Sequence, residues 1–264
     1  MNKLQIISLS LLALLTSYSH AQLTSNYFGY TDQKTGLKGT LYDLRVTAER
    51  RLSGISFYRA FGSILRKEFK QSELDKYLKF ESNKHLKFLH VPKLNAEQAL
   101  KEYGFRIKPQ QFIMLYEGEV EEAPKERFRF GGTFDDVICV FVNDRLVFYA
   151  SYQEGKLSYK PEDVSYRRKK DGVSHIAYGQ YITLKKRDKI KICVGEVPGG
   201  NFSGRLHVQL KNVEYKKDEY KDPILHPFIT GELTAEEKAK FPPSLFNLEK
   251  IPVFKFKKEE KEQK

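Results

Sequence analysis

The sequence predicts a mainly β protein with a helical insertion near the N-terminus and one short helix near the C-terminus. Short β-branched or aromatic runs separated by turn residues fill the chain from Phe112 to Tyr215. Helical periodicity is confined to residues 56–103 and to one late segment. Because the helices precede the main run of strands instead of alternating with it, this order favours an all-β core over a βαβ fold.

The expected strands are rich in residues that suit a pleated, buried surface. Arg127-Phe128-Arg129-Phe130 alternates with period two, so its phenylalanines should face the core and its arginines the solvent. Asn143-Asp144 should form a tight hairpin turn. The expected strands are Gly39–Arg45, Phe112–Val120, Arg127–Gly131, Val137–Val142, Leu146–Ser151, Tyr181–Leu184, Lys189–Val194 and Arg205–Val213.

Three helical segments are expected, two of them in the insertion at 56–103. Apolar residues at helical spacing predict an amphipathic helix over Ser56–Lys70, followed by a short turn. A second helix is expected over Ala96–Tyr103. Thr234 and Glu237 form a capping-box pattern for a third helix, Ala235–Phe241.

The first 21 residues have the pattern of a cleavable signal peptide. Lys3 precedes the apolar run Leu4–Leu15, and Ser19-His20-Ala21 fits a cleavage site. The run is too short to span a bilayer, and no later stretch approaches ~20 apolar residues, so no transmembrane segment is expected. The mature protein should be secreted or periplasmic. It should contain a β domain over 22–215, an extended connector with a short helix over 216–254, and a charged disordered tail over 255–264.

The chain is basic, with a formal net charge of +12. Such a surface favours anionic partners such as an acidic polysaccharide, lipid headgroups or nucleic acid. Export makes nucleic acid the least expected of these. The alternative is that the spread-out charge serves solubility alone. The run Arg167–Lys170, in an expected loop at Tyr166–Asp171, leaves the same two alternatives open: contact with an acidic polysaccharide or a solvated hairpin tip. The sequence leaves the oligomeric state open.

The only two cysteines, Cys139 and Cys193, lie in expected strands. Within Lys189–Val194, alternation places Cys193 opposite the face that carries the isoleucines. If the two strands are neighbours, a cross-strand disulfide could form. Two separate thiols are the favoured alternative, and either way the fold must depend on its core instead of a disulfide framework.

Standard catalytic signatures are missing from the sequence. It has no Gly-x-Ser-x-Gly elbow, no phosphate-binding glycine loop and no dinucleotide fingerprint. No two histidines have the spacing of a zinc-binding pair. The protein is therefore expected not to be an enzyme.

The stretch Tyr116–Val147 contains the most informative motifs. An alternating strand (Arg127–Phe130) is followed by the paired aspartates Asp135-Asp136 and then by Val140–Asp144, which leads into a hairpin. This order resembles the PA-fourteen domain, the lectin-like module named after protective antigen. The later stretch Tyr181–Phe202 resembles that family's closing section. The resemblance covers roughly residues 39–215 and implies a lectin-like antiparallel β-barrel or β-sandwich.

The sequence departs from the family pattern in three places. Val137 follows the aspartates where many relatives have glycine, and Asp144 follows Asn143 where the family has glycine. The helical stretch Ser56–Tyr103 is a further departure, which we interpret as an insertion.

The resemblance also implies a binding site. In sugar-binding members of the family, two adjacent carboxylates joined by a cis peptide bind one calcium ion, and sugar hydroxyls complete its shell. Asp135 and Asp136 match that pair. A second loop, expected at Gly195–Gly204, offers Glu196 as a calcium ligand and Asn201 as a carbohydrate ligand, together with backbone carbonyls. The alternative is that the aspartates accept backbone N–H bonds and shape their own loop.

The sequence thus predicts a secreted or periplasmic, non-enzymatic module that binds carbohydrate, with calcium as its only expected cofactor. The alternative is a structural or protein-interaction module of the cell envelope that retains a vestigial site.

Overall fold

The computed structural model describes residues 30–31, 36–45, 57–95, 111–151, 165–168, 175–197, 201–217, 223–239 and 251–258. The expected signal peptide and the expected helix at Ala96–Tyr103 lie outside these residues. Within them, no helix is both long and apolar enough to cross a membrane.

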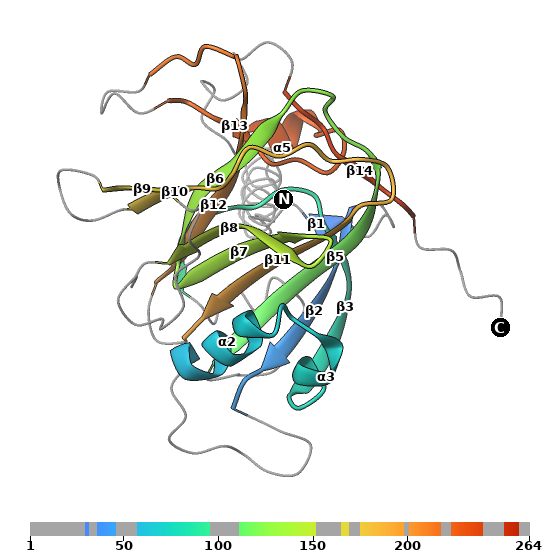
Figure 1. The fold of residues 1–264 in the computed structure, drawn as a ribbon, viewed down its shortest axis with the longest axis vertical. Coiled ribbons are helices and arrows are strands. Elements are labelled where there is room, and N and C mark those ends of the chain that lie inside the picture. Colours follow the sequence, from blue (N-terminus) through green and yellow to red (C-terminus); the bar gives the residue numbers. More distant parts are fainter. Residues whose placement is uncertain are drawn as a thin grey trace, which may run out of the picture.

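The described strands form two antiparallel sheets packed face to face (Figure 1). The first sheet has the order β1-β3-β2-β5-β11-β7-β8, with β14 also paired to β5. Its strands are β1 (Tyr30–Thr31), β2 (Leu37–Asp43), β3 (Leu78–Leu86), β5 (Phe112–Glu122), β7 (Val137–Val142), β8 (Arg145–Ser151), β11 (Lys189–Glu196) and β14 (Lys255–Phe256).

The second sheet has the order β13-β12-β6-β10-β9, with β4 also paired to β12. Its strands are β4 (His90–Asn95), β6 (Phe128–Asp135), β9 (Ser165–Arg168), β10 (His175–Tyr178), β12 (Asn201–Leu210) and β13 (His226–Pro227). Among the described residues neither sheet closes on itself, so of the two expected architectures the structure has the β-sandwich.

The main core lies between the sheets, where both contribute inward-facing residues. Phe128 and Phe130 of β6 are fully buried, as their alternation with arginines predicts. The ring of Phe128 meets the ring of Phe254 edge-on at 5.3 Å, and Phe130 meets Phe228 at 5.9 Å. Edge-to-face contacts at these distances are favourable beyond the area they bury. The C-terminal residues Phe228 and Phe254 thus belong to the same core as β6.

A second core covers the outer face of the first sheet. Helices α2 (Phe57–Arg66) and α3 (Gln71–Leu74) lie against that face (Figure 1). The apolar stripe of α2 stacks Phe57 on Phe61, and Phe69 then contacts Phe141 of β7. The predicted amphipathic helix is confirmed, although it ends at Arg66, ahead of the positive-φ residues Glu68 and Phe69.

The predicted helical insertion at 56–103 is wrong over Leu78–Asn95, which forms the strands β3 and β4. Each of these segments pairs with another strand: β3 pairs with β2, and β4 pairs with β12. These cross-strand hydrogen bonds satisfy the backbone there without a helix.

Two other strand predictions are also corrected. Among the described residues, Tyr181–Leu184 is not a strand and makes only one bridge, between Ile182 and Phe128 of β6, beyond the two positions at which β10 pairs with β6. Tyr166–Arg168, expected in a loop, lies instead in β9, which pairs with β10.

The two cysteines face each other across neighbouring strands. Cys193 of β11 is the register partner of Cys139 of β7, and both are free thiols with no exposed surface. Both lie in the core beneath α2, on the face that strand alternation predicts.

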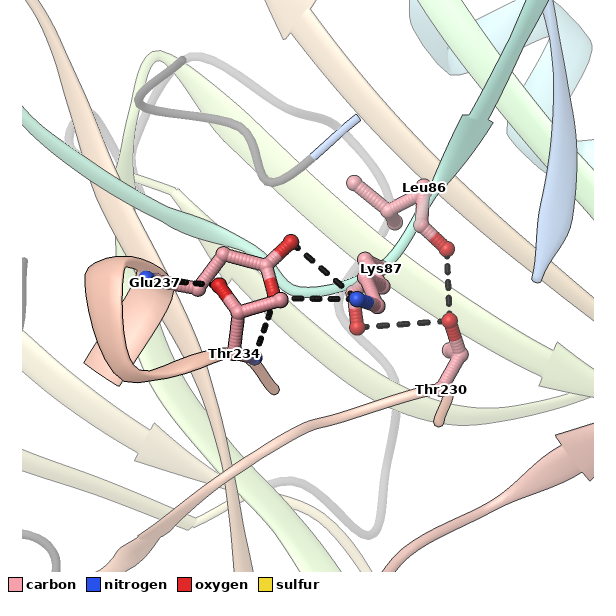
Figure 2. Close-up of polar contacts among 5 residues, drawn as sticks. All are labelled: Leu86, Lys87, Thr230, Thr234 and Glu237. Atoms are coloured by element: carbon pink, nitrogen blue, oxygen red, sulfur yellow. Dashed lines mark hydrogen bonds and ion pairs between the residues drawn. The ribbon is translucent and has the colours of Figure 1, made fainter. Parts of the chain in front are cut away.

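The C-terminal part of the chain packs on the sandwich. The Thr230 hydroxyl donates to the Leu86 carbonyl at 2.6 Å (Figure 2). The Thr230 backbone N–H donates to the Lys87 carbonyl at 2.7 Å. Lys87 also forms an ion pair of 2.9 Å with Glu237 of α5 (Ala235–Ala239). Thr234 and Glu237 exchange the two bonds of the predicted capping box, at 2.7 and 3.2 Å.

The expected connector therefore contributes to the core instead of only extending away from it. The segment expected to be a disordered tail begins with an ordered strand, since Lys255 and Phe256 form β14 and pair with β5. Phe256 is almost fully buried, which explains why the chain does not leave the fold at Lys255.

Candidate functional site

The acidic pair Asp135-Asp136 lies where the chain passes from one sheet to the other. Asp135 is the last residue of β6 in the second sheet, and β7 of the first sheet begins at Val137. The peptide bond between the two aspartates is cis, as the family resemblance implies. The pair thus sits at one edge of the sandwich, which we call the rim.

Three hydrogen bonds fix Asp136, whose exposed fraction is only 7%. Its Oδ1 accepts a hydrogen bond from the Tyr58 hydroxyl at 2.8 Å, and its Oδ2 accepts one from the Val197 backbone N–H at 2.9 Å. Its own N–H donates to the Gly195 carbonyl at 3.2 Å. These contacts tie Asp136 both to helix α2 and to the end of β11.

Glycine at position 195 permits this close approach. A Cβ atom there would lie 2.7 Å from Cζ of Phe57 and 2.8 Å from Cγ2 of Val137. Real Cβ atoms do not come that close to their neighbours, so a side chain would push β11 away from α2. The Gly195 backbone is therefore what brings Val197 within reach of Asp136.

Sequence reasoning did not assign any role to Tyr58. Burial, and then the hydrogen bond to Asp136, raise the pKa of the Tyr58 hydroxyl, so it stays protonated and donates. The contact joins residues 78 positions apart. The helical pattern places Tyr58 beside the buried stripe of α2, but no local signal identifies its partner.

Glu196 is the third carboxyl group of this region and is only 1% exposed. Its Oε2 atom is buried and has no hydrogen-bond partner. Burial, followed by the charges of Asp136 and Asp135, raises the pKa of Glu196 to about 10. A carboxyl with such a pKa carries a proton at neutral pH unless a cation takes the place of that proton.

The three carboxyl groups do not form one metal cage. Among the described residues, no three histidine, cysteine, aspartate or glutamate side chains are grouped closely enough to hold a metal ion. Strand alternation gives the reason: Glu196 lies on the same face of β11 as Ile192 and Val194, which face the core between the sheets. Asp136 instead contacts Tyr58 on the helix-covered side. Glu196 thus does not join the pair as a direct ligand in this structure.

The aspartate pair itself suits a hard cation, because carboxylate oxygens are the ligands that calcium prefers. The two groups bonded to the Asp136 carboxylate, a hydroxyl and a backbone amide, are both neutral. They orient the carboxylate without cancelling its charge. The residues present therefore fit a two-carboxylate calcium site, with the other oxygens coming from elsewhere.

Asn201, the other predicted ligand residue, is brought to the same edge of the sandwich. It is the first residue of β12, and its Cα partner across the strand pair is Asn95 of β4. Two residues later, Ser203 is the Cα partner of Asp135. The expected loop at Gly195–Gly204 is shorter than predicted, since β11 continues to Glu196 and β12 begins at Asn201.

No family model and no curated protein sequence matches this chain. Solved structures do resemble it. The structure is similar to PA14 domains. One is the PA14 domain of the MpAFP antifreeze protein, with 14% identity and a TM-score of 0.42, covering 76% of this chain and 88% of that chain.

Two further structures have a comparable likeness. The PA14 sugar-binding domain from an RTX adhesin has 15% identity and a TM-score of 0.39, covering 69% of this chain and 93% of the other. The A domain of epithelial adhesin 6 from Candida glabrata, in complex with Galb1-3GlcNAc, has 11% identity and a TM-score of 0.39, covering 80% and 93%.

Proposed function

We propose that this protein is a non-enzymatic module that binds carbohydrate at the rim, with Asp135 and Asp136 holding a calcium ion. The observation that supports this most strongly is the state of Asp136. Its carboxylate is buried and fixed at the sheet crossing by two neutral donors, and no lysine or arginine of the described residues pairs with it. A bound divalent cation would compensate it.

Each residue of the rim has a distinct part in this proposal. Tyr58 and the Val197 N–H orient the Asp136 carboxylate, and Asp135, which is only partly buried, faces incoming ligand. Asn201 stands at the start of the neighbouring strand as a hydrogen-bonding partner for sugar hydroxyls. Calcium, when bound, would supply open coordination positions for those hydroxyls.

A glycan array run with and without chelator tests this function. Glycan signal should appear with calcium and disappear with chelator. Asp135→Asn removes one negative charge at the rim and should abolish the signal, whereas Asp144→Asn, the same change at an exposed turn, should leave it unchanged. Binding that survives both chelator and Asp135→Asn would contradict the proposal.

A second candidate function is a structural or protein-interaction module. It is favoured by the same hydrogen bonds, because Asp136 links α2, β6 and β11 and so already stabilises the fold without any ligand. This function predicts a stable oligomer, an empty glycan array and a melting temperature that calcium does not change.

We also propose that the chain is exported. Cleavage after Ala21 would leave Gln22 as the first residue of the mature protein. N-terminal sequencing of protein recovered outside the cytoplasm should therefore begin at Gln22. A mature form that begins at Met1 would contradict export by a cleaved signal.

A further inference from the structure

A second concave site lies away from the rim, on the first sheet next to the C-terminal strand β14. It is a cavity of about 300 Å³. A cavity of that size is at the lower end of the range for small-molecule sites. Its lining residues are Gly36, Lys38, His85, Glu117, Gly118, Glu119, Lys257 and Lys258.

Strand register places three of the polar lining residues side by side. Lys38 of β2 is the Cα partner of both Glu117 in β5 and His85 in β3. The preceding residue Leu37 faces the core between the sheets, so by alternation Lys38 faces outward. Lys38, Glu117 and His85 therefore line the cavity on the outer face of the sheet.

The C-terminal segment also lines the cavity. Phe256 is buried in the main core and anchors the segment, and the Lys257 N–H donates to the Glu119 carbonyl at 2.9 Å. These contacts hold Lys257 and Lys258 at the cavity. Residues far apart in the sequence thus converge on one site, which no local motif could indicate.

Several charged side chains of the cavity have no partner in the part of the chain that the structure describes. Within the described residues, four of these side chains form no hydrogen bond and no ion pair: Glu117, Glu119, Lys257 and Lys258. Glu117 reaches solvent, yet the burial of its carboxyl raises its pKa against the lowering effect of Lys191. That combination is expected for a carboxyl on the wall of a hollow.

The chemistry of the lining restricts the ligand. The lysine side chains only donate hydrogen bonds, and the carboxyl oxygens of the two glutamates accept them. A ligand that satisfies both must offer acceptors together with several O–H donors. Lys257 and Lys258 are neighbours in sequence and both lie at the cavity, so a ligand that binds both should carry a negative charge.

We propose that this cavity binds the sugar ring of a uronic acid, with its carboxylate on Lys257 and Lys258 and its hydroxyls on Glu117 and Glu119. The site is separate from the aspartate pair of the rim and needs no metal ion.

Titration calorimetry of the full chain with glucuronate tests this assignment. Glucuronate should bind, and the uncharged sugar glucose should bind at least about tenfold more weakly. The double variant Lys257→Gln/Lys258→Gln should weaken glucuronate binding at least about tenfold, and added salt should weaken binding to the unaltered chain. Glu117→Gln should also weaken binding, because a charged acceptor becomes a neutral one.

The matched control is Lys216→Gln/Lys217→Gln, which removes the same charge from exposed positions elsewhere and should leave affinity unchanged. Asp135→Asn should leave glucuronate binding intact, which separates this cavity from the rim. The assignment is overturned if glucuronate does not bind, if an amino acid such as glutamate binds more tightly, or if the control weakens binding as much as the cavity variant.

Discussion

Two buried glutamates in this protein have opposite surroundings. Glu73 and Glu196 are 4% and 1% exposed. Two lysines, Lys67 and Lys76, each contact the Glu73 carboxylate at 2.7 Å. Burial acts to raise the pKa of Glu73, and the lysines outweigh it, so that its pKa is lowered. Glu196 has two aspartates nearby instead, so burial, and then the aspartate charges, raise its pKa to about 10.

The difference shows which buried carboxyl groups are paired with lysines among the described residues and which are not. At α3 the fold supplies its own cations, Lys67 and Lys76, so the Glu73 carboxylate is paired within the chain. At the rim the fold supplies a tyrosine hydroxyl and a backbone amide, which orient a carboxylate but leave its charge in place. In a basic protein of net charge +12, a buried carboxylate such as that of Asp136, which pairs with no lysine among the described residues, is suited to an added cation.

The largest expected effect comes from removing the Asp136 carboxylate. Asp136→Ala loses the bonds from Tyr58 and Val197 and leaves two part-buried donors without that acceptor, which should lower the free energy of unfolding by about 2 kcal/mol. Urea denaturation measures this. Glu122→Ala, at an exposed carboxylate paired with Lys255, serves as the control and should cause no measurable change. An equally small effect at Asp136 would mean that its contacts do not stabilise the rim.

The same substitution at the two glutamates should have opposite effects. Glu196→Gln removes a group that must keep its proton in the folded state, so in chelator at pH 8 it should raise the free energy of unfolding by about 2 kcal/mol. Glu73→Gln loses two lysine contacts and should lower the melting temperature by about 3 °C. Changes of the same sign at both positions would contradict the comparison.

The pH dependence follows from the two pKa shifts. The raised pKa of Glu196 means that the unfolded chain releases a proton which the folded chain keeps, so its contribution to stability falls as pH rises from about 4.5 toward 10. The lowered pKa of Glu73 has the reverse sign, and its contribution falls as pH drops below its ordinary pKa. Melting curves across pH should therefore flatten above pH 5 in Glu196→Gln but not in Glu73→Gln.

A smaller effect is expected where the C-terminal segment meets the sandwich. Lys87 and Glu237 are 12% and 16% exposed in their side chains. A double-mutant cycle of Lys87→Ala and Glu237→Ala should give a coupling of about 1 kcal/mol. A coupling near zero would show that Thr230 and the buried phenylalanines alone hold this segment.

The sequence patterns predicted correctly those features that depend on residues close together in the chain. The alternation in Arg127–Phe130 and around Cys193 gave the correct faces, because a strand's period of two depends only on neighbouring residues. The capping box of Thr234 and Glu237 was also predicted, since its partners are three residues apart. The aspartate pair was recognised from its order between two strand motifs.

Features that depend on distant contacts were missed. The strands β3 and β4 form because they pair with β2 and β12. Each partner strand is distant in the sequence, so no local pattern indicates the pairing. Tyr58 acquires its role from Asp136, far along the chain. Glu196 was identified as a candidate, but its inward direction follows from β11 continuing past Val194, where the sequence predicted a loop.

The most direct test of the account is a ¹³C NMR titration of the Glu196 carboxyl, with and without calcium. The account predicts that in chelator Glu196 stays protonated well above pH 7. It also predicts that calcium at the aspartate pair lowers the Glu196 pKa, because the cation cancels the charges that raise it. Two results would contradict the account: a Glu196 carboxyl that titrates near 4.5 in chelator, or a Glu196 pKa that calcium does not change. Either would mean that the rim is not an acidic site that binds a cation.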